Sequence, residues 1–363
     1  MDRKSQILED LRNFFESLAK DDVVAVLHHT DADGVCSGVI IAKVVERKRG
    51  KRIDFHFNQA ATEIAVLDKT VGILKENKVN KVIMTDLGVD QSPSNVKEIE
   101  KFAEIVVIDH HKVYNDISSK KTIFIKPHFV SEKNPAAYTA AKLCFDLGSE
   151  IADISGMDWV AAVGLIGDCA FTLWKDFLDS VFLKYKIEKK QDIFDTKLGK
   201  VSTIISDAEC FDSANASKAF DIIYNASNPD DVLDSELKKY REAVENEKAY
   251  WLEHVNEFAE FVGDTILYMI KPKYQIKPSL STHLSLEYPG KTIVVVQDMG
   301  EEVLDISARR RDEKIAVNEL LENATKGLEG SNAGGHVPAA GGRIRKRDFQ
   351  KFKENLFSLL KNG

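Results

Sequence analysis

Cysteine is scarce in this chain of 363 residues. Zinc ribbons, dithiol redox motifs and disulfide frameworks all need paired cysteines, and no CxxC pair occurs. The sequence therefore argues against all three kinds of site and favours a reducing compartment. Because the N-terminal stretch is charged and has no apolar core typical of a signal peptide, we expect a cytoplasmic protein. The four cysteines are Cys36, Cys144, Cys169 and Cys210.

Long apolar runs and the common phosphate-binding motifs are also missing. No run approaches the roughly 20 residues that span a bilayer, so we expect no membrane association. Neither GxxxxGK[ST] nor GxGxxG occurs, which removes support for an NTPase or a dinucleotide-binding protein. A net charge of −8 argues against binding nucleic acid through overall charge. From Ile306 onward, however, twelve Lys and Arg stand against seven Asp and Glu, so the C-terminal part is locally basic.

The order of apolar segments indicates an α/β fold. Short apolar, β-branched runs alternate with helical patterns, which predicts βαβ units. We therefore expect an N-terminal doubly wound, mostly parallel sheet. The predicted strands are 23–27, 53–57, 81–85 and 105–108, and the predicted helices are 5–18, 35–47, 61–75, 93–102, 136–147 and 159–166.

The pattern changes twice farther along the chain. Residues 171–261 are helical in pattern, and 236–261 could form one long amphipathic helix. Short strands then return, and with a final helix over 349–360 they indicate a smaller C-terminal α/β domain. The expected domains are residues 1–180, a helical linker or insert over 181–262, and residues 263–363. The C-terminal strands are predicted at 266–270, 293–296 and 303–307.

Asp109, His110 and His111 come directly after the apolar run 105–108. That run is continuously apolar and β-branched, which is typical of a strand buried in a parallel sheet. Ligands bind at the carboxyl edge of such sheets. The tripeptide is therefore a candidate for binding a metal or another ligand.

Similar residues occur at other predicted element ends. His29, Asp31 and Asp33 stand at alternate positions after the strand 23–27, which would place them on one side if the segment stays extended. Asp86 follows the strand 81–85, and Asp168 follows an apolar helix in a Gly-Asp turn. Carboxylates and imidazoles without thiolates suit Mn²⁺ or Mg²⁺ better than structural zinc. We therefore expect a metal site at this sheet edge.

Each residue has a plainer interpretation when it stands alone. An aspartate after a strand is commonly a helix cap or a turn residue, and a single histidine is often structural. Joint placement at strand ends favours the metal site over these separate roles. Crowded carboxylates need cations to stay ionised, and two ions bridged by one carboxylate would activate water and neutralise a phosphoryl group. The predicted chemistry is hydrolysis of a phosphate ester or anhydride.

These motifs resemble those of the DHH phosphoesterase superfamily. His29-Thr30-Asp31-Ala32-Asp33-Gly34, Asp86, Asp109-His110-His111 and Gly167-Asp168 are similar to its four motifs. The sequence GGHVPAAGG at 334–342 is similar to the GGH signature of the DHH-associated C-terminal domain, and Ser307-Ala308-Arg309 resembles its substrate-binding strand. The two-domain size and the HxDADG form are most similar to archaeal RecJ-like single-strand exonucleases.

The resemblance implies a Mn²⁺- or Mg²⁺-dependent phosphodiesterase with two ions in a cleft between its domains. It implies that Asp86 bridges the ions, that Asp109 orients a ligating imidazole, and that His111 contacts the scissile phosphate or acts as an acid. Family members vary at the position of His29. The implied metal ligands are His29, Asp31, Asp33, Asp86, His110 and Asp168.

For the C-terminal domain, the resemblance implies a glycine-rich loop that binds nucleic acid. Such a loop lets backbone N–H groups approach phosphate oxygens, although a tight turn is the plainer interpretation. A basic track along a single strand could continue through Arg310, Arg311, Arg343, Arg345 and Arg347, or these could form a solvated face. The implied substrate-binding residues are Ser307, Arg309, Gly334, Gly335, His336, Gly341 and Gly342.

Three functions remain open. The first is an exonuclease that releases mononucleotides from single-stranded DNA or RNA. The second is a phosphoesterase for small substrates: an oligoribonuclease, an adenosine 3′,5′-bisphosphate phosphatase or a cyclic-dinucleotide phosphodiesterase. The third is a non-catalytic replication or repair scaffold, against which the complete set of ligand residues argues. The partners to expect are single-stranded nucleic acid or short oligonucleotides, with a second copy or a replication or repair protein as further candidates.

Overall fold

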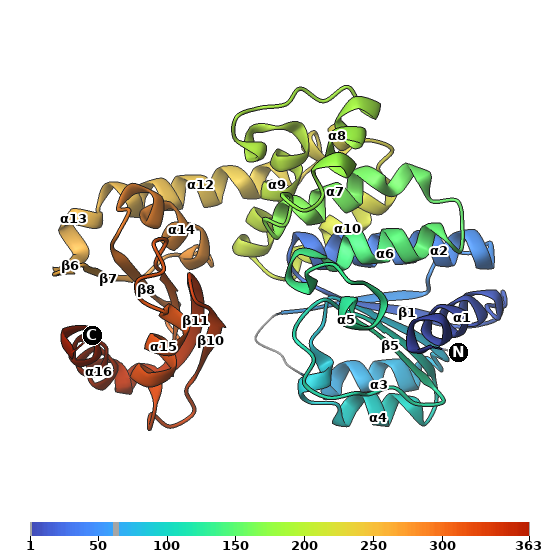
Figure 1. Ribbon diagram of the computed structural model, residues 1–363, viewed down its shortest axis with the longest axis horizontal. Coiled ribbons are helices and arrows are strands. Elements are labelled where there is room, and N and C mark those ends of the chain that lie inside the picture. The colour runs from blue at the N-terminus through green and yellow to red at the C-terminus, as the bar shows by residue number, and fades with distance from the viewer. Residues whose placement is uncertain (1, 61–64, 363) are drawn as a thin grey trace. The chain divides into compact units, whose positions relative to one another are not determined.

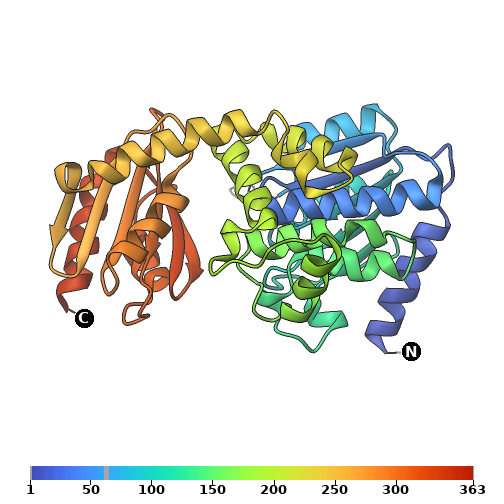
Figure 2. The same ribbon diagram turned by 90° about the horizontal axis from the view of Figure 1, so that it is seen from above.

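The computed structural model describes residues 2–60 and 65–362, with the backbone alone at 136, 336, 361 and 362, and it divides into two compact units. The first unit is Met1–Glu209 with Ser213–Arg241, and the second is Cys210–Asp212 with Glu242–Gly363. The boundary lies inside one long helix, α12 (Lys238–Glu253), which is seen along its length in Figure 2. The helical segment 181–262 is thus divided between the two units.

The first unit is built on a five-stranded parallel sheet with the order β2-β1-β3-β4-β5. The predicted parallel sheet is confirmed, and a fifth strand that was not predicted extends it. Every residue of β3 and the last four residues of β4 are buried, as expected for strands covered on both faces. The strands are β1 (Val24–His29), β2 (Phe55–Gln59), β3 (Lys81–Thr85), β4 (Glu104–Ile108) and β5 (Thr122–Ile125).

Helices cover both faces of this sheet (Figure 1). On one face, α3 (Asp68–Glu76) and α4 (Ser94–Glu100) pack against β1, β3 and β4 in a single apolar core. On the other face lie α2 (Ala32–Arg49), α6 (Ala140–Ser149) and α7 (Asp158–Gly167), which also pack against one another. The predicted helix 61–75 begins at Asp68, and its first four residues lie outside the described residues. With both faces covered, polar groups can gather only at the strand ends.

The remaining helices of the first unit complete these layers. Helix α1 (Arg3–Glu16) packs beside β5, and α10 (Asn215–Asn225) packs on α2. No helix in the described part of the chain is long and apolar enough to cross a membrane. The other helices are α5 (Pro127–Val130), α8 (Lys175–Lys184), α9 (Lys197–Phe211), α11 (Pro229–Leu233) and the 3₁₀ turns η1 (Val89–Gln91), η2 (Pro135–Ala137), η3 (Ser155–Met157) and η4 (Ile193–Asp195).

The chain turns from β1 into α2 earlier than predicted. Asp31 is the N-cap of α2, and its side chain accepts a hydrogen bond of 2.8 Å from the backbone N–H of Gly34. Asp33 therefore lies in the first helical turn, and the expectation of an extended course through residue 33 was wrong. A Cβ on Gly34 would lie 2.3 Å from the Cβ of His29, so only glycine lets the helix begin this close to the strand.

The second unit contains a six-stranded mixed sheet with the order β10-β11-β9-β8-β7-β6. Helix α14 (Lys277–Glu287) packs on one face, and α15 (Val317–Thr325) and α16 (Phe349–Asn362) pack on the other. The predicted α/β class is confirmed, although α14 and α15 were not predicted. The strands are β6 (Ala259–Val262), β7 (Thr265–Ile270), β8 (Thr292–Asp298), β9 (Val303–Arg309), β10 (Asn332–His336) and β11 (Ala339–Arg345), and the minor elements are α13 (Val255–Phe258) and η5 (Lys346–Asp348).

Two local predictions for this region were wrong. The single helix expected over 236–261 ends at Glu253, and its last residues form α13 and the edge strand β6. The glycine-rich segment 334–342 is a β-hairpin rather than a loop, with Gly334 paired to Gly341 across β10 and β11. The end of the first segment pairs with β7 as β6. In the second segment, pairing between β10 and β11 and with β9 outweighs the weak strand propensity of glycine.

Candidate metal centre

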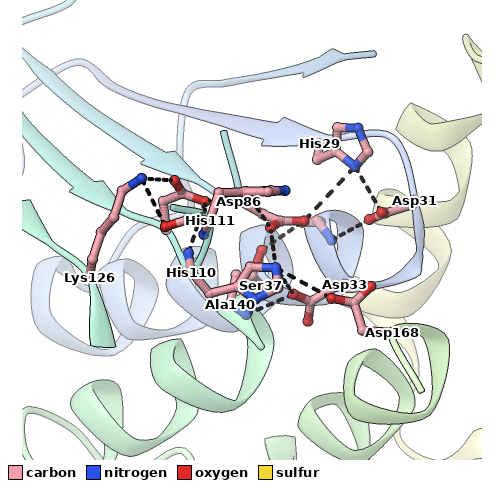
Figure 3. Close-up of polar contacts among 12 residues, drawn as sticks. His29, Asp31, Asp33, Ser37, Asp86, His110, His111, Lys126, Ala140 and Asp168 are labelled. Carbon is pink, nitrogen blue, oxygen red and sulfur yellow. Dashed lines mark hydrogen bonds and ion pairs between the residues drawn. The ribbon is translucent and has the colours of Figure 1, made fainter. Parts of the chain in front are cut away.

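Acidic and histidine side chains meet at the carboxyl ends of three strands of the first unit (Figure 3). His29 is the last residue of β1, Asp86 follows β3, and Asp109 follows β4. The start of α2 and the end of α7 add further carboxylates. The residues brought together are His29, Asp31, Asp33, Asp86, Asp109, His110, His111 and Asp168, which are all eight predicted for the first unit.

Asp86 lies between two groups of ligating atoms. Its Oδ1 is 3.3 Å from Nε2 of His110, and its Oδ2 is 3.9 Å from Nδ1 of His29. The backbone of Asp86 has a φ of +59°, a left-handed conformation that directs the chain away from β3. The two oxygens of one carboxylate thus face different histidines, which is the arrangement of a bridging ligand.

His110 is surrounded by carboxylates. Besides Asp86, its Nε2 lies 3.3 Å from Oδ2 of Asp168 and 3.8 Å from Oδ2 of Asp33. On the other side of Asp86, Nδ1 of His29 lies 3.0 Å from Oδ2 of Asp31. Asp31 therefore both caps α2 and lies in the cluster, so its role as a helix cap does not exclude the predicted role as a metal ligand.

The N-terminus of α6 holds Asp33 in place. Its Oδ2 accepts a hydrogen bond from the backbone N–H of Ala140 at 2.7 Å, and its Oδ1 accepts one from Ala141 at 2.9 Å. These hydrogen bonds at a helix N-terminus favour the ionised carboxylate, but burial outweighs them and raises the pKa of Asp33. A Cβ on Gly164 of α7 would lie 2.6 Å from Oδ1 of Asp33. Two helices of the covering layer therefore fix the position of this side chain.

Asp109 lies behind the cluster and contacts His111. It is fully buried, and its Oδ1 is 2.7 Å from Nδ1 of His111 and accepts the backbone N–H of His110 at 2.8 Å. The imidazole that Asp109 orients is thus that of His111, whose side chain is 49% exposed.

Burial and mutual repulsion raise the pKa of several carboxyl groups in the cluster. The pKa of Asp168 is raised to about 7 by burial and by the charges of Asp33 and Asp31. The same causes, burial and the charges of Asp33 and Asp31, raise the pKa of Asp86 well above its usual value. Without a cation these carboxylates cannot all stay ionised at neutral pH.

The pKa values of the three histidines in the cluster are also raised, which for histidine favours the charged form. Burial lowers the pKa of His29, but the charge and hydrogen bond of Asp31 outweigh it and raise that pKa to about 10. Against burial, Asp33 and Asp168 raise the pKa of His110, and the hydrogen bond to Asp109 raises the pKa of His111. Protonated imidazoles here compensate part of the negative charge that a metal ion would neutralise.

This donor set fits divalent cations. Nε2 of His29 and Oδ1 of Asp86 are buried and make no hydrogen bond within the described part of the chain. The imidazole nitrogens lie 3.0 to 3.9 Å from the neighbouring carboxylate oxygens. Two atoms at this separation can both bind one ion at about 2.1 Å each. Oxygen and nitrogen donors without sulfur suit Mn²⁺ or Mg²⁺. Three groups of donors could hold an ion: His29, Asp31 and Asp86; Asp33, His110 and Asp168; and Asp86, His110 and His111.

The residues predicted to bind substrate lie in the second unit, on three adjacent strands. Ser307 and Arg309 of β9 alternate with Ile306 and Ala308, whose side chains belong to the apolar core. Ser307 pairs with Gly341, and Gly341 pairs with Gly334, so these three positions share the face opposite that core. Gly335 and Gly342 occupy the other register positions, and His336 pairs with Ala339.

Gly334 and Gly335 have different roles in the hairpin. A Cβ on Gly334 would meet nothing within 4 Å. Gly335 has a φ of +140°, and a Cβ there would lie 2.6 Å from the carbonyl oxygen of Ala339. Gly335 is therefore required by the hairpin, whereas Gly334 keeps an open surface free of side chain.

Most arginines of the suggested basic track are paired within the unit. Arg343 contacts Asp305 at 2.7 Å, and Arg310 contacts Asp312 at 2.6 Å. Arg345 and Arg347 both contact Glu329. This pairing weakens the hypothesis of a continuous basic track.

Segments of both units match models of known protein families. Residues 23–163 match the DHH family, N-terminal domain, and residues 273–362 match the DHHA1 domain. The chain therefore contains a DHH domain and a DHHA1 domain. An uncharacterized protein of Methanocaldococcus jannaschii is 26% identical over 241 residues, which cover 61% of this chain and 52% of that protein. The chain thus spans about half the length of that relative.

Solved structures share the DHH fold. RecJ of Thermus thermophilus in complex with Mn²⁺ has a TM-score of 0.73 at 16% identity, covering 99% of this chain and 55% of that chain. The DHH domain of a member of the s1p family of ribosomal proteins has a TM-score of 0.73 at 16% identity, with 99% and 90% coverage. An exonuclease RecJ bound to manganese has a TM-score of 0.67 at 16% identity, with 96% and 93% coverage. At these identities the likeness shows the fold.

Several residues around the DHH motif were not predicted. Lys126 follows β5 and lies 2.9 Å from Oδ2 of Asp109 and 2.9 Å from Oδ1 of Asp90. Thr30 donates a hydrogen bond to Glu209 of α9. The signal for Lys126 was present, because it follows a short apolar strand just as Asp109 does, but that strand was not recognised. No local signal connects Glu209 to the first motif, since 179 residues separate it from Thr30.

Proposed function

We propose that this DHH-domain protein is a Mn²⁺- or Mg²⁺-dependent phosphodiesterase that holds two ions and hydrolyses single-stranded DNA or RNA from one end to mononucleotides. The observation that carries the proposal is the position of Asp86, whose two oxygens belong to separate donor groups. One carboxylate shared by two cation sites is the arrangement that in-line phosphoryl displacement requires. The Mn²⁺-bound exonuclease RecJ, whose fold this chain shares, supports the choice of ion and reaction.

The donor groups suggest which residues would hold the ions. His29, Asp31 and Asp86 would hold one, and Asp33, His110 and Asp168 the other, with Asp86 completing the second set. When bound, two such ions supply an activated water and neutralise charge on the phosphate. The N-cap position of Asp31 and the helix that holds Asp33 keep these carboxylates in place before the ions arrive.

His111 is the side chain available for the substrate. Its Nδ1 is engaged by Asp109, which also raises the pKa of His111, and the half-exposed imidazole in its doubly protonated form would donate from Nε2 to a phosphate oxygen or to the leaving oxygen. In the second unit, Ser307 and Arg309 with Gly334 and Gly341 are proposed to bind the phosphate backbone. The absence of side chains at the two glycines allows close approach to backbone N–H groups.

A specific observation favours a second candidate. Because Arg310, Arg343, Arg345 and Arg347 are paired with carboxylates, a long strand would gain little from a basic track. A small substrate, such as an oligoribonucleotide of a few residues, adenosine 3′,5′-bisphosphate or a cyclic dinucleotide, needs no track. The scaffold hypothesis is disfavoured, since every predicted ligand is present in the cluster. We include a cytoplasmic location in the proposal, for which the scarcity of cysteine is the support.

The test uses metal-stripped full-length protein supplied with Mn²⁺ and given single-stranded DNA and RNA from two to about forty nucleotides, labelled at either end. Release of a labelled mononucleotide from one end of long strands is expected and would give the direction. Turnover restricted to the shortest oligomers would move the protein to the small-substrate class. Hydrolysis that persists in Asp86→Asn at the wild-type rate would show that another site or a contaminant is responsible.

A further inference from the structure

A lysine is completely buried behind the DHH motif. Lys126 follows β5, and its side chain has no exposed surface. Its Nζ lies 2.9 Å from Oδ2 of Asp109 and 2.9 Å from Oδ1 of Asp90, and it donates to the carbonyl oxygens of His111 at 3.1 Å and Lys112 at 2.7 Å. The three hydrogen bonds of the ammonium thus go to Asp90 and to the two carbonyl oxygens, and its contact with Asp109 is an ion pair without a hydrogen bond.

A buried ammonium is costly unless it is paired, so its retention calls for an explanation. Stability alone explains it poorly, because an apolar cluster of similar volume is often as stable as a buried ion pair. What the ion pair adds is a fixed direction. Figure 3 shows Lys126 well apart from His29, Asp31 and Asp168, and the cation contacts the carboxylate of Asp109 without entering the metal cluster.

The same lysine fixes the chain that carries the two histidines. It binds the carbonyl groups of His111 and Lys112 directly. Asp90, its second carboxylate partner, accepts the backbone N–H of Tyr114 at 2.7 Å and lies on the loop after β3. The segment after β4 is therefore tied to its neighbours on both sides of the motif.

The contacts continue through Asp109 to an imidazole. Oδ2 of Asp109 faces Lys126, while Oδ1 accepts from Nδ1 of His111 at 2.7 Å. An ionised carboxylate can only accept, so it selects the His111 tautomer with the proton on Nδ1. The ion pair between Lys126 and Oδ2 on the other side of the carboxylate holds it in this orientation.

We propose that Lys126, with Asp90, is a positioning residue for His111: it holds the carboxylate of Asp109 and the backbone of His111 in place, so that Oδ1 of Asp109 faces Nδ1 of His111 and the imidazole presents Nε2 to the substrate. The role of His111 toward substrate rests on the proposed function. The orientation of the imidazole does not, and it can be tested separately.

Another buried lysine provides a matched control. Lys81 pairs with Glu104 at 2.8 Å and donates to Ser17 at 3.0 Å. It begins β3, whereas the metal cluster lies beyond the other end of that strand. Lys81→Met should lower stability and leave His111 unaffected.

The first experiment reads the tautomer of His111. Lys126→Met alone leaves Asp90 and Asp109 without their shared cation, so Lys126→Met is combined with Asp90→Asn. Lys126→Gln, which keeps a donor without the charge, is the second variant. Nitrogen shifts of ¹⁵N-histidine-labelled, Mg²⁺-loaded protein at pH 9 report the tautomer, with His111→Ala assigning the signal. The Nδ1–H form should dominate in the wild type and in Lys81→Met and lose ground to the Nε2–H form in both Lys126 variants. An unchanged tautomer in a folded Lys126 variant would overturn the proposal.

The second experiment is a double-mutant cycle on hydrolysis. The combined Lys126 and Asp90 change should lower kcat about 10-fold in the wild-type background. In the His111→Ala background it should lower kcat less than about 2-fold, because its effect acts through His111. Mn²⁺ affinity, measured by calorimetry, should change by less than about 2-fold. Equal losses of kcat in both backgrounds would show a structural role and overturn the proposal. Should the wild type hydrolyse none of the substrates, the proposed function fails, and the tautomer experiment still decides the role of Lys126.

Discussion

Oδ1 of Asp86 lies 3.3 Å from Nε2 of His110, yet the oxygen is buried and forms no hydrogen bond to a described residue. These two atoms are close enough to bind the same cation, but their alignment does not allow a hydrogen bond between them. Burial together with the charges of Asp33 and Asp31 holds the pKa of Asp86 well above its usual value. In the metal-free fold, the surroundings of Asp86 therefore disfavour its ionised form. Strongly shifted pKa values of this kind are common at functional sites.

Asp86→Asn should show separately how the Asp86 carboxylate affects metal binding and how it affects the stability of the metal-free fold. Asparagine, like aspartate, tolerates the left-handed φ of +59° at this position. We expect Mn²⁺ affinity to fall by about 100-fold or more, since both donor groups lose a ligand. The Tm of the metal-free variant should rise, because a repelled carboxylate is gone. Calorimetric titration with Mn²⁺ and melting in a chelator measure the two effects.

Asp86→Ala is the contrasting variant. Alanine in a left-handed conformation costs about 1–2 kcal/mol, so its metal-free Tm should lie below that of Asp86→Asn. Equal Mn²⁺ affinity in Asp86→Asn and in the wild type would contradict the assignment of Asp86 as a ligand.

The stability of the metal-free protein should fall as the pH rises above neutrality. Asp31 raises the pKa of His29 to about 10 against the effect of burial, and the ordinary value is 6.5. The folded state therefore binds more protons than the unfolded state, so the free energy of unfolding decreases from pH 6.5 toward pH 10. Burial lowers the pKa of His28 to about 3, so that group changes stability only below pH 6.5. Each kcal/mol lost lowers Tm by about 2–4 °C in a unit of this size.

Mg²⁺ binding should restore the stability that the metal-free protein loses at high pH. Cation binding displaces the protons held by the cluster, including that of Asp168, whose pKa burial and neighbouring carboxylates raise to about 7. The gain in Tm on adding Mg²⁺ should thus be larger at pH 8.5 than at pH 7, and affinity should weaken below pH 7. Melting curves at the two pH values test this, and a gain independent of pH would argue that the ion binds away from the cluster.

Gly164→Ala should impair the metal site from the helical layer. The added Cβ would lie 2.6 Å from Oδ1 of Asp33 and 2.5 Å from the Cβ of Ala141. Alanine otherwise favours helices by about 1 kcal/mol, so any loss comes from this contact. We expect Mn²⁺ affinity to fall about 10-fold. Gly156→Ala, where a Cβ would meet nothing within 4 Å, is the matched control and should bind Mn²⁺ normally.

The hairpin of the second unit offers a paired test of structure against binding. Gly335→Ala would force a Cβ to 2.6 Å from the carbonyl oxygen of Ala339 and should lower Tm by several degrees. Gly334→Ala has open space and should keep the wild-type Tm. If this face binds substrate, Gly334→Ala should raise KM about 10-fold or more with little change in kcat. A normal KM would remove Gly334 from the proposed binding face.

Apolar runs were sufficient to predict β3 and β4 because these two central strands are buried on both faces. Residues 82–84 and 105–108 are continuously apolar, and each run lies within a strand of the sheet. Asp86 and Asp109 could then be placed at one edge, since parallel strands end on the same side. The strand 122–125 was missed because it is short and lies beside a lysine- and serine-rich stretch, and Lys126 was missed with it.

The glycine-rich hairpin could not be predicted from local pattern. Gly334 and Gly341 have weak strand propensity, and it is pairing with β9 that makes the segment extended. The hydrogen bonds of Asp33 to the N-terminus of α6 are likewise invisible in sequence, because 107 residues separate Asp33 from Ala140. Contacts of this range depend on the arrangement of layers, which local composition does not encode.

The close packing of Gly34 on His29 changes how mutational data on this motif should be interpreted. In a saturation screen scored by activity, position 34 should tolerate substitution as poorly as the aspartates beside it, although it supplies no functional group. Any side chain there would have to fit within 2.3 Å of the Cβ of His29 and would push the helix carrying Asp33 away from the strand carrying His29. Intolerance to substitution at residue 34 would therefore measure the spacing between strand and helix and should not be counted as evidence of chemistry.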